Sequence, residues 1–440
     1  MTATPSAATP AVTSEQSGHL KRSLGMWAIV GLGLGYMTPT VIFDTFGIVS
    51  EETNFVVPMA YLLAMVAMGF TALSYGRMVR VFPSAGSAYT YASETIHPNV
   101  GFVIGWSSLL DYLLLPLVNA LILRSYMEAF FPDVPPWIWV VIVVAAVTGL
   151  VLVSMSNTSR LNGVLVMFSI VLIVVFVVLT WRQLAQGEGN GTIFSTQPFW
   201  HPGTSLGPVI TGATIVCFSF IGFDAITIIG GAVFFIAGWF AQSRFPTMDG
   251  FSQDALENSA LPEMAEMIGG TLFKAFLTAA AFAATLASGL ASHASVSRML
   301  YVMGRNGRGP ISRTLSYIHP RFHTPALAVA FVGLVSLLAI PLNLDFVAAL
   351  INFGALMAFS FVNLTVIVWF AGRRGERRTP KEIWRNIILP ALGVFSTLVL
   401  WINLSPDSFN YGLIWLALGI VIMLVLTRFW RRPLRMQLEE

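Results

Sequence analysis

Three carboxylates stand inside apolar stretches of this 440-residue chain that are long enough to cross a bilayer: Asp44, Asp111 and Asp224. A carboxylate at membrane depth is costly unless it is paired, hydrogen-bonded or hydrated. A hydrogen bond between helices, or a position at the membrane interface, is the structural alternative for each of them. No Lys or Arg lies deep enough to neutralise all three, since Arg124 reaches only the outer end. The pattern therefore favours a cationic substrate, a coupling cation, or both.

Aromatic residues flank these carboxylates in the sequence: Tyr36, Phe43, Tyr112, Phe220 and Phe223. The face of an aromatic ring can hold an alkylammonium group by a cation–π contact of about 0.5–2 kcal/mol. Ordinary packing inside the membrane explains Phe43 and Phe223 equally well.

A stretch rich in small residues, TLASGLASHASVSRMLYVMGR, contains a histidine at position 293. His293 could carry protons near neutral pH, or it could equally be hydrogen-bonded against a neighbouring helix. No Cys or His pair has the spacing of a metal site, and neither a Gly–x–Ser–x–Gly elbow nor a Walker loop occurs. We therefore expect no cofactor, no metal, and neither an enzyme nor an ATP-driven pump.

The composition indicates the environment that must position these residues. Hydrophobic residues make up 56% of the chain and charged residues 10%, whereas soluble domains carry about 25% charged residues. So much apolar surface requires the bilayer as solvent, and the chain is predicted to be an all-α integral membrane protein. The net charge of +3 comes from basic residues in short loops, which indicates membrane topology and not a nucleic-acid surface.

Membrane spans of about 20 mostly apolar residues are expected within the following stretches: 26–50, 56–75, 98–122, 137–156, 162–181, 208–241, 269–302, 325–341, 346–370, 386–404 and 410–429. Residues 1–20 are predicted to be a disordered tail, residues 21–435 a single transmembrane domain, and residues 436–440 a second tail. Placing Lys21 and Arg22 in the cytoplasm puts most other basic loops on that side as well. The opposite side keeps only Arg124, Arg182, Arg244 and Lys274.

The stretch 208–241 must cross an even number of times, because a single crossing would turn every later basic loop outward. Two crossings there give twelve spans, with both termini cytoplasmic. Yet 34 residues of helix cover about 51 Å, while two crossings of the hydrocarbon core need about 60 Å and a turn. A distorted or shallow hairpin is therefore expected.

The first and sixth spans both contain helix-breaking residues near their middle. The first span contains Gly31, Gly33, Gly35 and Pro39, and the sixth contains Gly212 and Gly222. Interrupted helices at corresponding places are typical of inverted-repeat transporters with a site at the membrane midplane.

Several long strings together resemble the amino acid–polyamine–organocation superfamily, and most closely its bacterial putrescine importers. They are GLGYMTPTVIFDTFGIVS, FPSAGSAYTYA, GWSSLLDYLLLPL, TGATIVCFSFIGFDAIT, TLASGLASHASVSRMLYVMGR and ALINFGALMAF. The resemblance implies a LeuT-like bundle of two five-span inverted repeats plus two C-terminal spans. It also implies that about twenty residues are missing after Thr227, which shortens the junction between the sixth and seventh spans.

By this resemblance, substrate would lie between the first, third, sixth and eighth spans. The implied contacts are Tyr36, Asp44, Asp111, Tyr112, Phe220, Asp224, Ser288 and Ser292, with Asp224 and His293 as candidates for proton coupling. The expected activity is proton-coupled import of putrescine or a similar diamine across the bacterial inner membrane, with lipids as the only other partners. One alternative is an amino-acid permease. The other is a membrane receptor or scaffold whose transport is impaired by the shortened junction.

Overall fold

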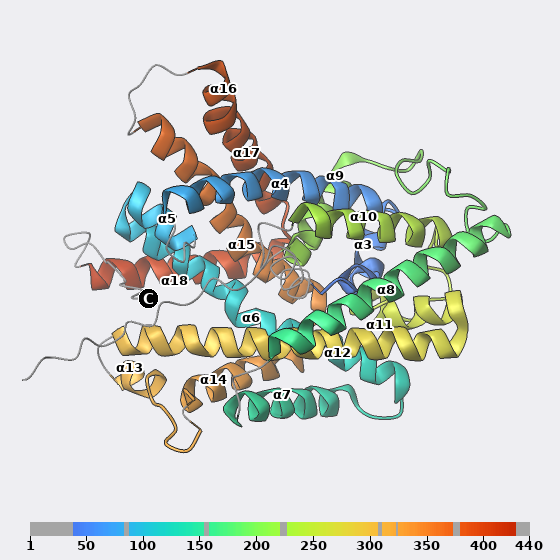
Figure 1. Ribbon diagram of the computed structural model, residues 1–440, viewed down its shortest axis with the longest axis horizontal. Coiled ribbons are helices and arrows are strands. Elements are labelled where there is room, and N and C mark those ends of the chain that lie inside the picture. The colour runs from blue at the N-terminus through green and yellow to red at the C-terminus, as the bar shows by residue number, and fades with distance from the viewer. Residues whose placement is uncertain are drawn as a thin grey trace, which may run out of the picture.

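The computed structural model describes residues 38–82, 88–153, 158–220, 227–306, 310–322, 324–372 and 379–427. Every regular element within these ranges is helical, and many of the helices lie side by side along the long axis of the molecule (Figure 1). In this part of the chain, eight helices are long and apolar enough to cross a membrane, and Leu206–Phe220 and Ala326–Ala339 form two shorter apolar helices. The predicted all-α membrane architecture is confirmed.

The N-terminal half contains α2 (Val41–Asp44), α3 (Phe46–Glu52), α4 (Val57–Val81), α5 (Ala88–Thr95), α6 (Pro98–Phe130), α7 (Pro136–Val153) and α8 (Thr158–Ala185). The middle contains α9 (Leu206–Val216), the 3-10 segment η1 (Cys217–Phe220), α10 (Thr227–Arg244), α11 (Gln253–Glu257), α12 (Leu261–Asn306) and α13 (Pro310–Leu315). The C-terminal part contains α14 (Ala326–Ser336), η2 (Leu337–Ala339), α15 (Leu344–Ile367), η3 (Val368–Gly372), α16 (Pro380–Ile383), η4 (Trp384–Ile388), α17 (Leu389–Ile402) and α18 (Pro406–Leu426).

Local sequence explains where several helices begin. The ring of His97 accepts a hydrogen bond from the backbone two residues later, and Pro98 occupies the first turn of α6. Asn343 caps α15 by accepting from the backbone N–H of Phe346. Such side chains satisfy the free N–H groups of a first helical turn.

Some helices extend beyond their predicted spans. The stretch 98–122 was expected in the membrane, whereas α6 continues to Phe130 and, with 33 residues, is about 50 Å long. Apolarity marks only the part of a helix inside the hydrocarbon core, about 30 Å thick. In α12, Gly270 interrupts the helix with φ 72° and ψ −174°, a conformation that suits glycine because it has no Cβ.

The segment from α9 to α10 is a hairpin whose two outer ends lie at the same end of the bundle. Before α9, Gly203 accepts a hydrogen bond from the side chain of Asn54. After α10, Arg244 forms an ion pair with Glu188, in the same loop that leads into α9. Both helices pack against α4 (Figure 1). Both outer ends lie at one end of the bundle, as an even number of crossings requires, and α9 with η1 is short: its 15 residues span about 22 Å.

Helix α18 is attached to α6 by two tryptophans. The rings of Trp106 and Trp415 stack at 4.7 Å with an angle of 17° between their planes. Each indole N–H donates to the other residue's backbone carbonyl, at 2.9 and 3.0 Å. Gly419 permits this approach, because a Cβ at that position would collide with the Trp106 ring.

The two ends of the bundle differ in charge. One end of the bundle holds the loop that follows α8 and is called the loop end. There, Arg124, Arg244 and Lys274 each form an ion pair with a glutamate. At the other end of α4, Arg80 and Arg385 of η4 both lie close enough to Arg77 for their charges to repel it. The described basic residues at the loop end are thus mostly neutralised, whereas cations accumulate at the opposite end.

Candidate functional site

Among the described residues, Asp44 is the charged residue most completely enclosed by the protein, with none of its surface exposed. It ends the short helix α2, which begins after Thr38 in a left-handed conformation (φ 47°). That conformation is unusual for a β-branched residue, and Thr38 precedes Pro39, one of the residues predicted to interrupt the first span.

Two hydroxyls hold the carboxylate of Asp44. Tyr126 of α6 donates to Oδ1 at 2.8 Å, and Ser259, in the linker between α11 and α12, donates to the same oxygen at 2.7 Å. The other oxygen, Oδ2, is buried and has no hydrogen-bond partner among the described residues. The site therefore keeps one unused acceptor, which is costly in an apolar interior and is suited to a proton or to a cationic N–H donor.

Further hydroxyls surround this carboxylate. Those of Thr40 and Thr285 lie near the Tyr126 hydroxyl, and the oxygens of both threonines are buried. The Asp44 cluster, defined as Asp44, Thr40, Tyr126, Ser259 and Thr285, thus joins the first span, α6 and α12 with its preceding linker. It supplies oxygen acceptors but no basic side chain.

An aromatic group adjoins the Asp44 cluster on the side of the hairpin. Thr45, next to Asp44, shares a 2.8 Å hydrogen bond with the hydroxyl of Tyr61. The Tyr61 ring lies 6.4 Å from that of Phe220 and 5.5 Å from that of Phe234. The structure therefore brings Phe220 close to Asp44, within a packed apolar group in which Phe220 is 1% exposed.

Asp111 and Tyr112 lie elsewhere on α6. Fifteen residues separate Asp111 from Tyr126, which corresponds to about 22 Å along the helix. Asp111 is half-buried, and Tyr112 is 36% exposed. In this conformation Asp111 and Asp44 therefore do not share one site.

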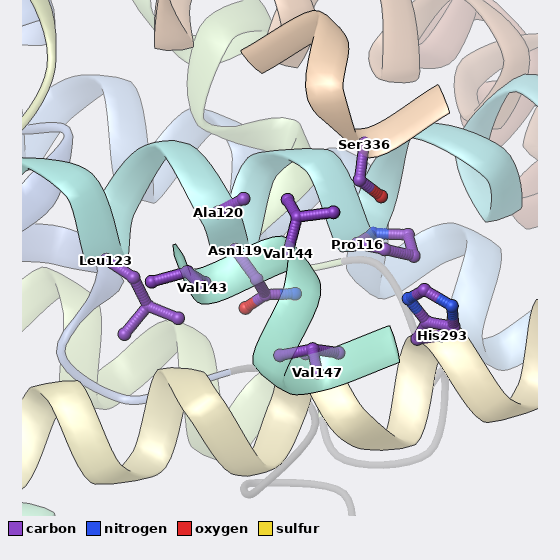
Figure 2. A pocket seen from close by; sticks show the side chains of 10 residues that line it. Pro116, Asn119, Ala120, Leu123, Val143, Val144, Val147, His293 and Ser336 are labelled. Atoms are coloured by element: carbon purple, nitrogen blue, oxygen red, sulfur yellow. The ribbon is translucent and has the colours of Figure 1, made fainter. Parts of the chain in front are cut away.

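His293 lines a different cavity, formed by α6, α7, α12 and the end of α14 (Figure 2). Its volume of about 10 Å³ is roughly that needed for one water molecule, so it is too small for an organic cation. The His293 ring is buried and its Nε2 lies 3.1 Å from the carbonyl oxygen of Val329. Asn119 and Ser336 contribute polar groups to the same cavity.

The remaining predicted residues divide into two groups. Ser288 and Ser292 are buried in α12, and the Ser292 hydroxyl donates to the backbone carbonyl of Gly289. Tyr36 and Asp224 lie outside the described residues. Among the described residues, no group of three or more His, Cys, Asp or Glu side chains could hold a metal ion.

Sequence reasoning missed both hydrogen-bond partners of Asp44. Tyr126 is 82 residues away in the chain and Ser259 is 215 residues away. Tyr126 offered the signal of a hydroxyl late in an apolar helix. Ser259 belongs to the polar linker between α11 and α12 and carries no such signal, so only the fold reveals its contact.

Comparisons with known proteins agree with this architecture. Two family models, both described as "Amino acid permease", match residues 28–234 and 228–426. The low-affinity putrescine importer PlaP of Escherichia coli K12 is 42% identical over 94% of this chain and 96% of its own length. In Bacillus subtilis, the branched-chain amino acid permease BcaP is 26% identical over 95% of both chains. The methylthioribose transporter of the same organism is 24% identical over 94% of this chain and 95% of its own. This chain belongs to the amino acid permease family of the amino acid–polyamine–organocation superfamily.

Proposed function

We propose that this chain imports putrescine or a similar small diamine together with protons, by alternating access. The observation that carries this proposal is the buried Asp44 carboxylate, whose described hydrogen-bond partners are all hydroxyls and which retains one free acceptor oxygen. A negative charge enclosed in this way favours a cationic partner. The 42% identity to a putrescine importer supports a diamine as that partner.

The proposed fold is the LeuT-like arrangement of two five-span inverted repeats followed by two further spans, twelve in all. The left-handed backbone of Thr38 in the first span and the 3-10 segment Cys217–Phe220 in the sixth support it. Interruptions at corresponding places are expected where two repeats enclose a midplane site.

In the proposed cycle, Asp44 exchanges a proton for one ammonium end of the diamine. Ser259 and Tyr126 hold the carboxylate while the site is closed, and the α11–α12 linker that carries Ser259 covers it from the loop end. The second ammonium group would be bound by Asp224, with Tyr36 and Phe220 beside the methylene chain. His293 is proposed to respond to protons from its separate cavity.

The proposed orientation places both termini in the cytoplasm of a bacterial cell and the loop end outside the inner membrane. The arginines gathered at the far end of α4 support this orientation, since Lys and Arg are retained on the cytoplasmic side.

Uptake into proteoliposomes tests the function directly. Labelled putrescine should accumulate when the outside is made more acidic than the inside, and diamines of similar length should compete better than shorter or longer ones. Effective competition by branched-chain amino acids instead would favour an amino-acid permease, the alternative supported by the similarity to BcaP. Binding of putrescine without accumulation would favour a receptor or scaffold.

A further inference from the structure

A buried guanidinium near the end of α4 has a free donor group. Arg77 is 9% exposed, and its Nη1 is buried without a hydrogen-bond partner. The side-chain charges that act on it most are those of Arg385 and Arg80, which repel it. A buried, unpaired cation among other cations is unfavourable, so this corner of the molecule is electrostatically suited to an anion.

Packing between three helices explains why these cations come together. One turn before Arg77 on the same face of α4, Ser74 donates to Asn363 of α15 at 2.6 Å. Asn363 in turn lies directly against Gly393 of α17. The helices α4 and α17 run in opposite directions. Arg77 follows Ser74 in α4, and Arg385 precedes Gly393, so both arginines lie at the same end of the bundle.

The backbone around this corner is irregular in both neighbouring helices. Two π-helical segments, η3 and η4, contact each other here. The ring of Phe82, which follows α4, lies 5.1 Å from that of Trp369 in η3. Single π-turns occur frequently at functional sites.

The carboxylate of Glu382 lies near these arginines but caps a helix. Glu382 accepts hydrogen bonds from the backbone N–H and the hydroxyl of Thr379, at 2.9 and 3.0 Å, and so caps α16. It does not pair with Arg77. Glu382 and Arg385 attract each other by their charges, whereas Arg77 has no carboxylate partner among the described residues.

The surface beside the cations is apolar and faces outward. Trp384 is 53% exposed and Ile388 is 37% exposed, on either side of Arg385. Exposed tryptophan is typical of the level at which lipid headgroups meet the hydrocarbon core, and basic pockets between helices on the cytoplasmic side bind anionic headgroups.

We propose that Arg77, Arg80 and Arg385 form a binding site for the phosphate of an anionic phospholipid. Guanidinium groups present planar sets of N–H donors that match phosphate oxygens, and the apolar surface of η4 would contact the acyl chains. The site is independent of the substrate proposed above.

Thermal unfolding of the purified full-length protein in detergent tests the proposal. Cys217 is the single cysteine of the chain and is 1% exposed, so a thiol-reactive dye reports unfolding. Phosphatidylglycerol should raise the unfolding temperature by several degrees, whereas phosphatidylcholine and millimolar inorganic phosphate should not. Arg77→Gln should lose at least half of this shift.

Two further variants complete the experiment. Arg385 is exposed, so Arg385→Gln should fold normally. It should also lose at least half of the rise in unfolding temperature that phosphatidylglycerol causes. This variant keeps the test valid if Arg77→Gln folds poorly. Arg182→Gln, an exposed arginine at the opposite end, should retain the rise. An undiminished shift in Arg385→Gln, or an equal shift with phosphatidylcholine, would overturn the proposal. If inorganic phosphate reproduces the shift, the site binds small anions and the lipid assignment is wrong.

Discussion

The Asp44 carboxylate uses its two oxygens differently. One accepts two hydrogen bonds from hydroxyls, and the other accepts none although both are enclosed. Hydrogen bonds to a charged group contribute about 1.5–3 kcal/mol each, whereas a buried acceptor without a partner destabilises the protein. This asymmetry is what a site requires if it must bind and release a cation.

Asp44→Asn should abolish proton-driven putrescine uptake while leaving the protein in the membrane. The amide keeps the size of the carboxylate but can neither carry the negative charge nor exchange a proton. Uptake into proteoliposomes measures the effect, with Asp407→Asn as the control because Asp407 is an exposed aspartate at the start of α18. Normal uptake by a well-folded Asp44→Asn protein would remove Asp44 from the transport site.

Tyr126→Phe and Ser259→Ala should interact when combined. Each removes one hydroxyl from the same carboxylate oxygen and should lower the free energy of unfolding by about 1.5–3 kcal/mol. The double variant should lose more than the sum, because Oδ1 is then left without a donor. Denaturation of the four proteins in detergent completes this cycle, and strictly additive losses would show that the two hydroxyls do not act on a shared oxygen.

Asp44 was identifiable from the sequence because a carboxylate in an apolar run is conspicuous. Its partners were not, since hydroxyl residues are common in membrane helices and nothing local connects position 44 with position 259. The separation of Asp111 from Asp44 was also hidden. Both residues lie in apolar spans, but their depth along those spans depends on how the helices are offset.

Among the helices, the hairpin of α9 and α10 departs most from a regular membrane span. Its first arm ends in a 3-10 segment at Phe220, and its second begins at Thr227. Close contact with the first span holds it in place, because Gly212 of α9 lies directly against the methyl group of Thr53.

Gly212→Ala should therefore lower the unfolding temperature by several degrees, and Thr53→Ser should restore it in the double variant. Serine removes only the methyl group that collides, and it retains the oxygen that accepts from the N–H of Val56. Gly207→Ala is the matched control on α9, because a Cβ there meets nothing within 4 Å. If the serine change fails to rescue Gly212→Ala, the close approach of these two helices is wrong.

Hydropathy predicted most helices because each membrane crossing demands about 20 apolar residues. It could not locate the break at Gly270 or the π-helical segments η3 and η4, which depend on backbone geometry and on neighbouring helices. The even number of crossings between 208 and 241 came from charge, since loop charges report sidedness even where helix length is ambiguous.

For the molecule as a whole, charge distribution and the hairpin support the same arrangement. Ion pairs neutralise basic residues at the loop end, and a group of mutually repelling arginines occupies the other end. A hairpin that returns to the loop end preserves this separation for every helix that follows it.

Cysteine labelling should detect this sidedness. Thr247, after α10, and Lys381, in α16, are both exposed. Thr247→Cys should react with a membrane-impermeant thiol reagent on intact spheroplasts, whereas Lys381→Cys should react only after the membrane is opened. The unmodified protein is the blank because Cys217 is buried. Reaction of both variants from one side would contradict the hairpin, and a reversed result would contradict the proposed orientation.

The paired tryptophans that join α6 to α18 have an evolutionary consequence. Since the Trp106 ring occupies the space that a Cβ on Gly419 would need, neither position is free to vary while the other is unchanged. Substitutions at the two sites should therefore be correlated among relatives, with alanine or larger at 419 accompanied by a smaller residue at 106. The order of substitution should also be constrained. If the side chain at position 106 becomes smaller first, the intermediate protein has a cavity. If the side chain at position 419 becomes larger first, the intermediate protein has a steric clash. Ancestral sequences are accordingly expected to change the tryptophan before the glycine.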